Sequence, residues 1–151
     1  MLIVTNNEKI ILSSEYKTEE FANIISKKLK LGDIVFLYGE MGVGKTTFIK
    51  YLINTFQKQN KLELTEVTSP TFNILNEYEI NKVNISHYDL FRLKSPEELK
   101  DLNLFEKKLN EISLIEWPEI IDKKPKNLIK LFFKYEDDHK SRSVLIKGLD
   151  L

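Results

Sequence analysis

Residues 34–46 read IVFLYGEMGVGKT, and this stretch decides the fold. Its first five residues, Ile34–Tyr38, form a short continuous apolar run, which is typical of a β-strand buried on both faces. Three of the 5 glycines in the chain follow within six residues, a clustering that indicates unusual backbone angles or close approach to a ligand. Residues 46–57 then place apolar side chains at helical spacing, with Phe48 and Leu52 among them. The stretch therefore predicts a buried strand, a glycine-rich loop and a helix in succession.

The loop between this strand and this helix matches the pattern G-x-x-x-x-G-K-[ST], in which backbone N–H groups wrap around a phosphate. Glycines keep side chains out of the loop, and the following helix adds free N–H groups and the positive end of its dipole. Lys45 can reach the β- and γ-phosphates of a nucleotide, and the Thr46 hydroxyl can coordinate magnesium. We therefore predict that the chain binds ATP with Mg²⁺. The residues expected to contact the nucleotide are Gly39, Glu40, Met41, Gly42, Val43, Gly44, Lys45, Thr46 and Thr47.

Two acidic residues stand where a second metal-side group is expected. Glu116 ends the apolar run Ile112–Ile115, and Asp89 follows the predicted strand that carries His87. In open α/β sheets ligands bind at the carboxyl ends of strands, so both acids would face the phosphates. Phosphoryl transfer needs a held magnesium ion and an oriented water, so Asp89 and Glu116 join Thr46 as candidate metal ligands. Either acid could equally be an ordinary surface carboxylate, and a strand histidine such as His87 is more often structural than catalytic.

Three further candidates depend on weaker patterns. Thr71, in the segment Ser69–Phe72, could offer its hydroxyl to a γ-phosphate as part of a switch segment, although an ordinary turn fits the same spacing. Trp117 is the only tryptophan, and a buried core position is the default expectation for it. The charged segment Glu136–Arg142 fits a solvated loop, from which Arg142 could reach a nucleotide.

The other patterns complete a single α/β domain spanning residues 1–151, with a P-loop NTPase-like mixed sheet flanked by helices. One helix is expected over residues 18–29, and Ser95-Pro96-Glu97-Glu98 has the form of a capping box that opens another. Further strands are expected over residues 3–12, 71–78, 82–88, 112–115, 128–135 and 144–147, the last two forming a closing hairpin.

The composition excludes several classes of function. The chain has no cysteine, so disulfides, thiolate metal sites and cysteine nucleophiles are ruled out. Its 23 basic residues balance 23 acidic residues, which disfavours strong stand-alone binding to nucleic acid or to an anionic membrane. Neither a signal-peptide pattern nor an apolar run of membrane-spanning length is evident, so we expect a soluble, cytoplasmic protein.

Several segments resemble one family in the same order along the chain. They are GEMGVGKTTF, TSPTFNILNEY, HYDLFRL, SPEEL and IEWPE. Together they are similar to TsaE, also called YjeE, a small bacterial P-loop ATPase, and the resemblance runs from about residue 18 to residue 119. It implies a mixed sheet flanked by helices and a role in making the threonylcarbamoyl modification of adenosine beside the tRNA anticodon. It also implies partners similar to TsaB and TsaD, which a cycle of ATP hydrolysis would reset, and indirect contact with tRNA through that complex.

The resemblance also implies roles for individual residues. Thr46 and Glu116 would hold magnesium, and Asp89 would support the metal or the attacking water. Lys45 would hold the phosphates, Thr71 would belong to the switch segment, and Trp117 would pack beside the nucleotide-side acid. The expected catalytic set is Lys45, Thr71, Asp89 and Glu116.

Two other functions remain open from the residues. A small-molecule kinase fits the length and the loop, and residues 136–142 would then be its lid, although their charge is mixed. A nucleotide-gated binding module that needs no turnover fits the same loop.

Overall fold

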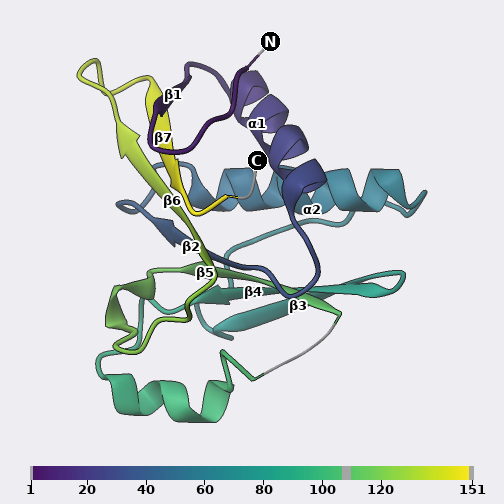
Figure 1. Ribbon diagram of the computed structural model, residues 1–151, viewed down its shortest axis with the longest axis vertical. Helices are drawn as coiled ribbons and strands as arrows, with labels where there is room; N and C mark the ends of the chain where they lie inside the picture. Colours follow the sequence, from purple (N-terminus) through teal and green to yellow (C-terminus); the bar gives the residue numbers. More distant parts are fainter. Residues whose placement is uncertain (1, 107–109, 150–151) are drawn as a thin grey trace.

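The computed structural model describes residues 2–106 and 110–149, and its strands form one seven-stranded mixed sheet (Figure 1). The strand order is β1-β7-β6-β2-β5-β4-β3. β2 (Ile34–Tyr38) lies in the middle, parallel to β5 (Glu111–Glu116) on one side and to β6 (Leu128–Tyr135) on the other. β4 (Val83–Asp89) extends the parallel set beyond β5. The predicted mixed α/β sheet is therefore confirmed.

Antiparallel strands form both edges of the sheet. β3 (Leu75–Ile80) pairs with β4 at one edge. At the other edge β7 (Arg142–Lys147) pairs with β6, and β1 (Lys9–Leu12) pairs with β7. The predicted closing hairpin is thus confirmed as β6 and β7. The four central strands run parallel, so β2, β4, β5 and β6 end at the same edge of the sheet.

Two α-helices cover one face of the sheet. α1 (Glu15–Lys28) is preceded by Ser14, whose side chain caps the helix by accepting a hydrogen bond from the Lys17 N–H at 3.3 Å. α2 (Lys45–Gln59) follows the glycine-rich loop and packs against α1. Strand alternation turns Val35 and Leu37 of β2 toward this face, where they join the main core.

The opposite face has a smaller core and a thinner cover. Phe36 of β2 and Ile115 of β5 point to this side. Two 3₁₀ helices lie over them: η1 (Pro96–Leu102), which Figure 1 shows on the side away from α1 and α2, and η2 (Pro118–Ile120). The central strands β2 and β5 are therefore buried on both faces, as their continuous apolar runs predict.

Two predicted strands are too long at their N-terminal ends. The strand expected over residues 3–12 begins only at Lys9, because the chain turns at Asn7 with φ of 64° and only an isolated bridge at Asn6 precedes it. The strand expected over residues 71–78 begins at Leu75, because a turn precedes it. That turn is closed by a 2.7 Å hydrogen bond from the Ile74 N–H to the Pro70 carbonyl.

The capping-box prediction at Ser95 is wrong in its details. Ser95 stands at the N-cap position, but its side chain makes no capping hydrogen bond, and the helix is 3₁₀ rather than α. The Glu98 carboxylate instead accepts from the Lys94 N–H at 2.9 Å. The helix expected over residues 18–29 also begins earlier, at Glu15, because Ser14 supplies its cap. Within the described part of the chain, no helix is long and apolar enough to cross a membrane.

Candidate functional site

The glycine-rich loop connects the end of β2 to the start of α2, and its backbone requires glycine. Gly44 occupies the N-cap position of α2 with φ of 114°, in the left-handed region. Gly39 has φ of 146°, and a Cβ atom there would lie 2.8 Å from the Phe133 carbonyl oxygen and 2.9 Å from a Val43 methyl carbon. Strand β6 therefore lies so close to the loop that no side chain fits at residue 39.

A cleft of about 240 Å³ lies beside this loop, at the edge where the parallel strands end. Most of the predicted site residues line it: Met41, Gly42, Gly44, Lys45, Thr46, Thr47, Thr71, Asp89 and Glu116. Three predicted contacts do not. The Val43 side chain is fully buried in the main core, and the Glu40 side chain is exposed. Gly39 contributes its carbonyl group to Lys45 instead.

Lys45 is held against the loop and an aromatic ring. Its Nζ donates to the Gly39 carbonyl oxygen at 2.5 Å and lies 3.7 Å from the centre of the Trp117 ring. Burial lowers the pKa of Lys45, and the negative charges of Glu116, Glu119 and Asp89 act in the opposite direction. Trp117 is only partly buried and lines the cleft with Glu116, so the default expectation of a buried core position is wrong, whereas the place beside the acid that the resemblance implies agrees with the structure. Trp117 directly follows the end of β5, and its backbone is left-handed, with φ of 58°.

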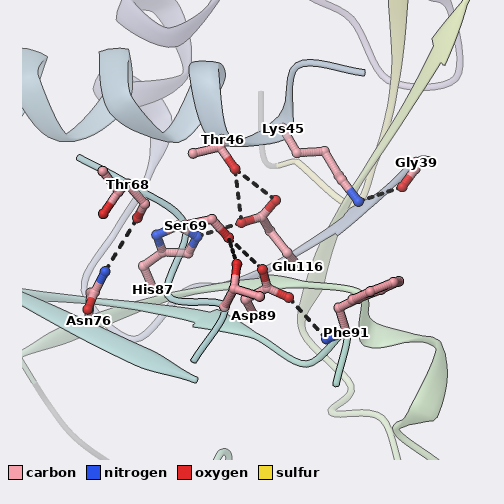
Figure 2. Close-up of polar contacts among 11 residues, drawn as sticks. Gly39, Lys45, Thr46, Thr68, Ser69, Asn76, His87, Asp89, Phe91 and Glu116 are labelled. Carbon is pink, nitrogen blue, oxygen red and sulfur yellow. Dashed lines mark hydrogen bonds and ion pairs between the residues drawn. The ribbon is translucent and has the colours of Figure 1, made fainter. Parts of the chain in front are cut away.

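Glu116 lies under the first turn of α2 (Figure 2). Its two carboxylate oxygens lie 3.3 and 3.4 Å from the Thr46 hydroxyl oxygen. Its Oε2 atom also lies 2.7 Å from Nε2 of His87, which is fully buried on β4. Thr46 and Glu116 are separated by 70 residues in the sequence, and the parallel pairing of β2 with β5 brings them together.

Asp89 stands beside Glu116 in the sheet, because the register of β4 and β5 pairs these two residues directly. Both of its carboxylate oxygens accept hydrogen bonds, as Figure 2 shows: Oδ1 from the Phe91 N–H at 3.0 Å and Oδ2 from the Ser69 hydroxyl at 2.5 Å. The Thr71 hydroxyl lies 3.4 Å from that of Ser69. The segment that carries Thr71 is therefore linked to Asp89 through Ser69.

The oxygen atoms at this edge fit a magnesium ion. Mg²⁺ prefers octahedral oxygen ligands at about 2.0–2.1 Å, which places neighbouring ligands about 3 Å apart. The separations of 3.3 and 3.4 Å between the Thr46 hydroxyl and the Glu116 carboxylate are close to that spacing. One carboxylate and one hydroxyl, with phosphate oxygens and water, form a ligand set typical of magnesium in nucleotide sites.

The β6–β7 hairpin closes the cleft at the loop. Tyr135 donates its phenolic hydrogen to the Gly42 carbonyl oxygen at 2.9 Å, and it pairs with Arg142 across the hairpin. The Arg142 side chain lines the cleft, and a Cβ atom on Gly44 would lie 3.5 Å from its Cδ. Its Nε is buried and has no hydrogen-bond partner among the described residues. The sequence places Arg142 within reach of a nucleotide, and the structure puts its side chain at the cleft.

Two contributors to the site, Tyr135 and Ser69, were not predicted. Tyr135 ends a strand and has no motif around it, and its contact with the loop joins residues 93 positions apart. Ser69 stands in the same short segment as Thr71, and that neighbourhood is the only sequence signal for it.

Comparisons with known proteins agree with this architecture. Residues 12–144 match the family of the threonylcarbamoyl adenosine biosynthesis protein TsaE. The TsaE protein of Rickettsia bellii is 44% identical over 135 residues, covering 89% of this chain and 91% of its own. That of Nostoc sp. is 33% identical over 136 residues, covering 86% and 80%. A crystal structure of Bacillus subtilis YdiB matches with a TM-score of 0.71 at 22% identity, over 99% of this chain and 88% of that one.

These comparisons answer two predictions made from the sequence. The YdiB likeness, at its low identity, concerns the fold alone and agrees with a P-loop-like mixed sheet. The family match extends beyond residues 18–119, where the motifs lie, on both sides. The chain therefore belongs to the TsaE family.

Proposed function

We propose that this chain is the ATP-hydrolysing subunit of the machinery that makes threonylcarbamoyladenosine in tRNA. The single observation that carries the proposal is the convergence of Lys45, Thr46, Asp89 and Glu116 on one cleft beside a phosphate-binding loop. Membership of the TsaE family supports the tRNA-modification role, because relatives are named for threonylcarbamoyladenosine biosynthesis.

The cleft residues have distinct tasks in this proposal. The backbone N–H groups of the loop and the first turn of α2 bind the phosphates. Lys45 leaves the Gly39 carbonyl and pairs with the phosphates, whose negative charge favours its ammonium form. Arg142, whose buried Nε has no hydrogen-bond partner in the described part of the chain, is a second cation at the same cleft. Thr46 and Glu116 hold magnesium, which when bound neutralises charge on the transferring phosphoryl group.

Asp89 acts on the water side of the site. Its Oδ2 already accepts a hydrogen bond from the Ser69 hydroxyl. The turn that follows Ser69 is also attached to Asp89, because the Asp89 N–H donates to the Ile74 carbonyl at 2.9 Å. Asp89 therefore orients the attacking water or supports the metal. Thr71 offers its hydroxyl to the γ-phosphate, so the segment that carries it responds to whether that phosphate is present.

Turnover depends on partners in this proposal. Proteins similar to TsaB and TsaD would complete the site, and tRNA would be reached through that complex. Of the two arginines in the sequence, Arg142 lines the cleft and Arg92 does not; the Arg92 guanidinium carbon lies 5.1 Å from the centre of the exposed Phe72 ring. We expect hydrolysis by the chain alone to be slow, because the partners complete the site in this proposal.

The test is the rate of ATP hydrolysis with and without the TsaB and TsaD proteins of the same organism. We expect the rate to rise when both are added and to vanish in Lys45→Ala. Lys50→Ala is the matched control, because Lys50 is an exposed lysine of the same helix. Equal rates with and without the partners, or undiminished hydrolysis by Lys45→Ala, would count against the proposal.

A further variant, Glu116→Ala, separates one of the alternatives. A nucleotide-gated module predicts that Glu116→Ala still binds ATP and still supports tRNA modification. The kinase alternative places a lid at residues 136–142, of which Arg142 lines the cleft whereas residues 136–141 close into a tight turn. The Glu136 N–H donates to the Ser141 carbonyl at 2.9 Å, and Asp138 accepts from the Lys140 and Ser141 N–H groups.

A further inference from the structure

His87 is buried at the centre of the site and contacts only one polar partner that the structure describes. Its side chain is fully buried on β4, on the same face as Asp89 and α2. Nε2 lies 2.7 Å from Oε2 of Glu116, and Figure 2 shows this contact between the two side chains. Its other ring nitrogen, Nδ1, is buried without a hydrogen-bond partner among residues 2–106 and 110–149.

This asymmetry fixes where the ring proton lies. A carboxylate offers only acceptor atoms, so the 2.7 Å contact needs a proton on Nε2 of His87. The 2.7 Å contact therefore makes Nε2 the ring nitrogen that donates to Glu116, while Nδ1 has no hydrogen-bond partner among the described residues.

The same contact restrains Glu116. One of its oxygens is held by His87, while the Thr46 hydroxyl lies within 3.4 Å of both oxygens. The register of β4 and β5 pairs His87 with Leu114 and Asp89 with Glu116, so the histidine approaches the carboxylate from the neighbouring strand and two residue pairs earlier. The ring can therefore fix the direction of the carboxylate without occupying the cleft, whose lining does not include His87.

We propose that His87 is a positioning residue that aims the Glu116 carboxylate at the magnesium ion by donating its Nε2 hydrogen to Oε2. This inference rests on the proposed function, because it assigns Glu116 to the metal. Outer hydrogen bonds of this kind orient metal ligands, and their loss typically weakens metal binding or activity about 10–100-fold.

Magnesium titration of three variants tests the proposal. MgCl₂ is titrated by calorimetry into protein saturated with a non-hydrolysable ATP analogue. We expect His87→Leu, which loses the donor, to raise the Mg²⁺ dissociation constant about 10–100-fold. We expect His87→Gln, whose amide can donate from a similar position, to recover part of this loss. Ser86→Ala is the matched control, because Ser86 is equally buried on β4 but bonds Glu111 on the opposite face.

A second measurement does not depend on bound magnesium or on activity. Long-range ¹H–¹⁵N correlation of the wild-type histidines should show the His87 hydrogen on Nε2. Analogue binding in EDTA should be equal in all four proteins, since His87 acts only through the metal ligand. The absence of a hydrogen on Nε2 would overturn the proposal, and so would an unchanged Mg²⁺ dissociation constant in folded His87→Leu.

The outcomes for His87 and for the proposed function are distinguishable. If wild-type protein binds neither nucleotide nor Mg²⁺, the proposed function fails, and the spectrum still decides whether His87 donates to Glu116. If His87→Leu does not fold, His87→Gln and the wild-type spectrum decide the question. In that case a Mg²⁺ dissociation constant of His87→Gln close to that of wild type, together with a hydrogen on Nε2 in the wild-type spectrum, supports the proposal. The absence of a hydrogen on Nε2 overturns it.

Discussion

Replacement of Gly39 by alanine is the sharpest test of the phosphate loop. The residue has φ of 146°, a conformation that side-chain-bearing residues adopt at a cost of about 1–3 kcal/mol. The new Cβ would also lie 2.8 Å from the backbone carbonyl oxygen of Phe133, which belongs to β6 and cannot rotate away. Overpacking of this kind costs about 1–3 kcal/mol more. We therefore expect Gly39→Ala to lower the free energy of unfolding by roughly 2–6 kcal/mol.

Gly32→Ala is the matched control. Gly32 also has a positive φ, of 93°, but a Cβ there would meet no atom within 4 Å. Its substitution should therefore show backbone strain alone, about 1–3 kcal/mol. Gly32 lies in the turn before β2, at the opposite end of that strand from the loop.

The assay is chemical unfolding with and without MgATP. At a ligand concentration of about 100 times the dissociation constant, binding adds about 2.7 kcal/mol to the stability of a protein. We expect Gly32→Ala to keep that increment and Gly39→Ala to lose most of it, because its loop must shift away from Phe133. Equal destabilisation by the two substitutions, or full stabilisation of Gly39→Ala by MgATP, would refute the reasoning.

Three further predictions concern charge and fluorescence. Burial lowers the pKa of Lys45, so its ammonium is unfavourable in the nucleotide-free protein. Lys45→Met should therefore unfold at no lower denaturant concentration than wild type, but MgATP should not increase its stability. A clear loss of stability without nucleotide would contradict this. The hydrogen bond to Glu15 raises the pKa of Tyr51 from 10.0 to about 12, so the stability it contributes is present below pH 10 and lost as pH rises through 12. Tyr51→Phe should remove this alkaline loss and the latest phase of tyrosine absorbance titration; an unchanged profile would show that the phenol is not held. Trp117 is the only tryptophan and lies 3.7 Å from the Lys45 ammonium, so MgATP should change its fluorescence in wild type but not in Lys45→Met. A wild-type emission unaffected by saturating MgATP would argue that Lys45 stays on the ring.

The sequence predicts the part of the site that depends on local spacing. Gly39 to Thr46 is a contiguous motif between a strand and a helix, so its geometry follows from neighbouring residues. Asp89 and Glu116 were predicted because each ends a strand, and parallel strands end at one edge of a sheet. Their direct pairing adds a register that no local pattern specifies.

Contacts between distant segments were beyond prediction. The support of the loop by Tyr135 depends on β6 lying beside β2, and the contact of His87 with Glu116 depends on β4 lying beside β5. A core position is the default expectation for a single tryptophan, and only the family resemblance places Trp117 beside the acid; in the structure it directly follows β5 with a left-handed backbone and lines the cleft. Hydrophobicity and spacing do not encode that backbone conformation.

The unequal cover on the two faces of the sheet has a consequence for motion. One side is shielded by two long α-helices that also pack on each other, whereas the other is shielded by short 3₁₀ turns over a small apolar cluster. Segments with few apolar contacts open locally at low free energy. Backbone amides of η1 and η2 should thus exchange their hydrogens well before those of α2. We therefore expect β2 and α2, which hold the phosphate loop, to be less mobile than the 3₁₀ helices on the opposite face of the sheet.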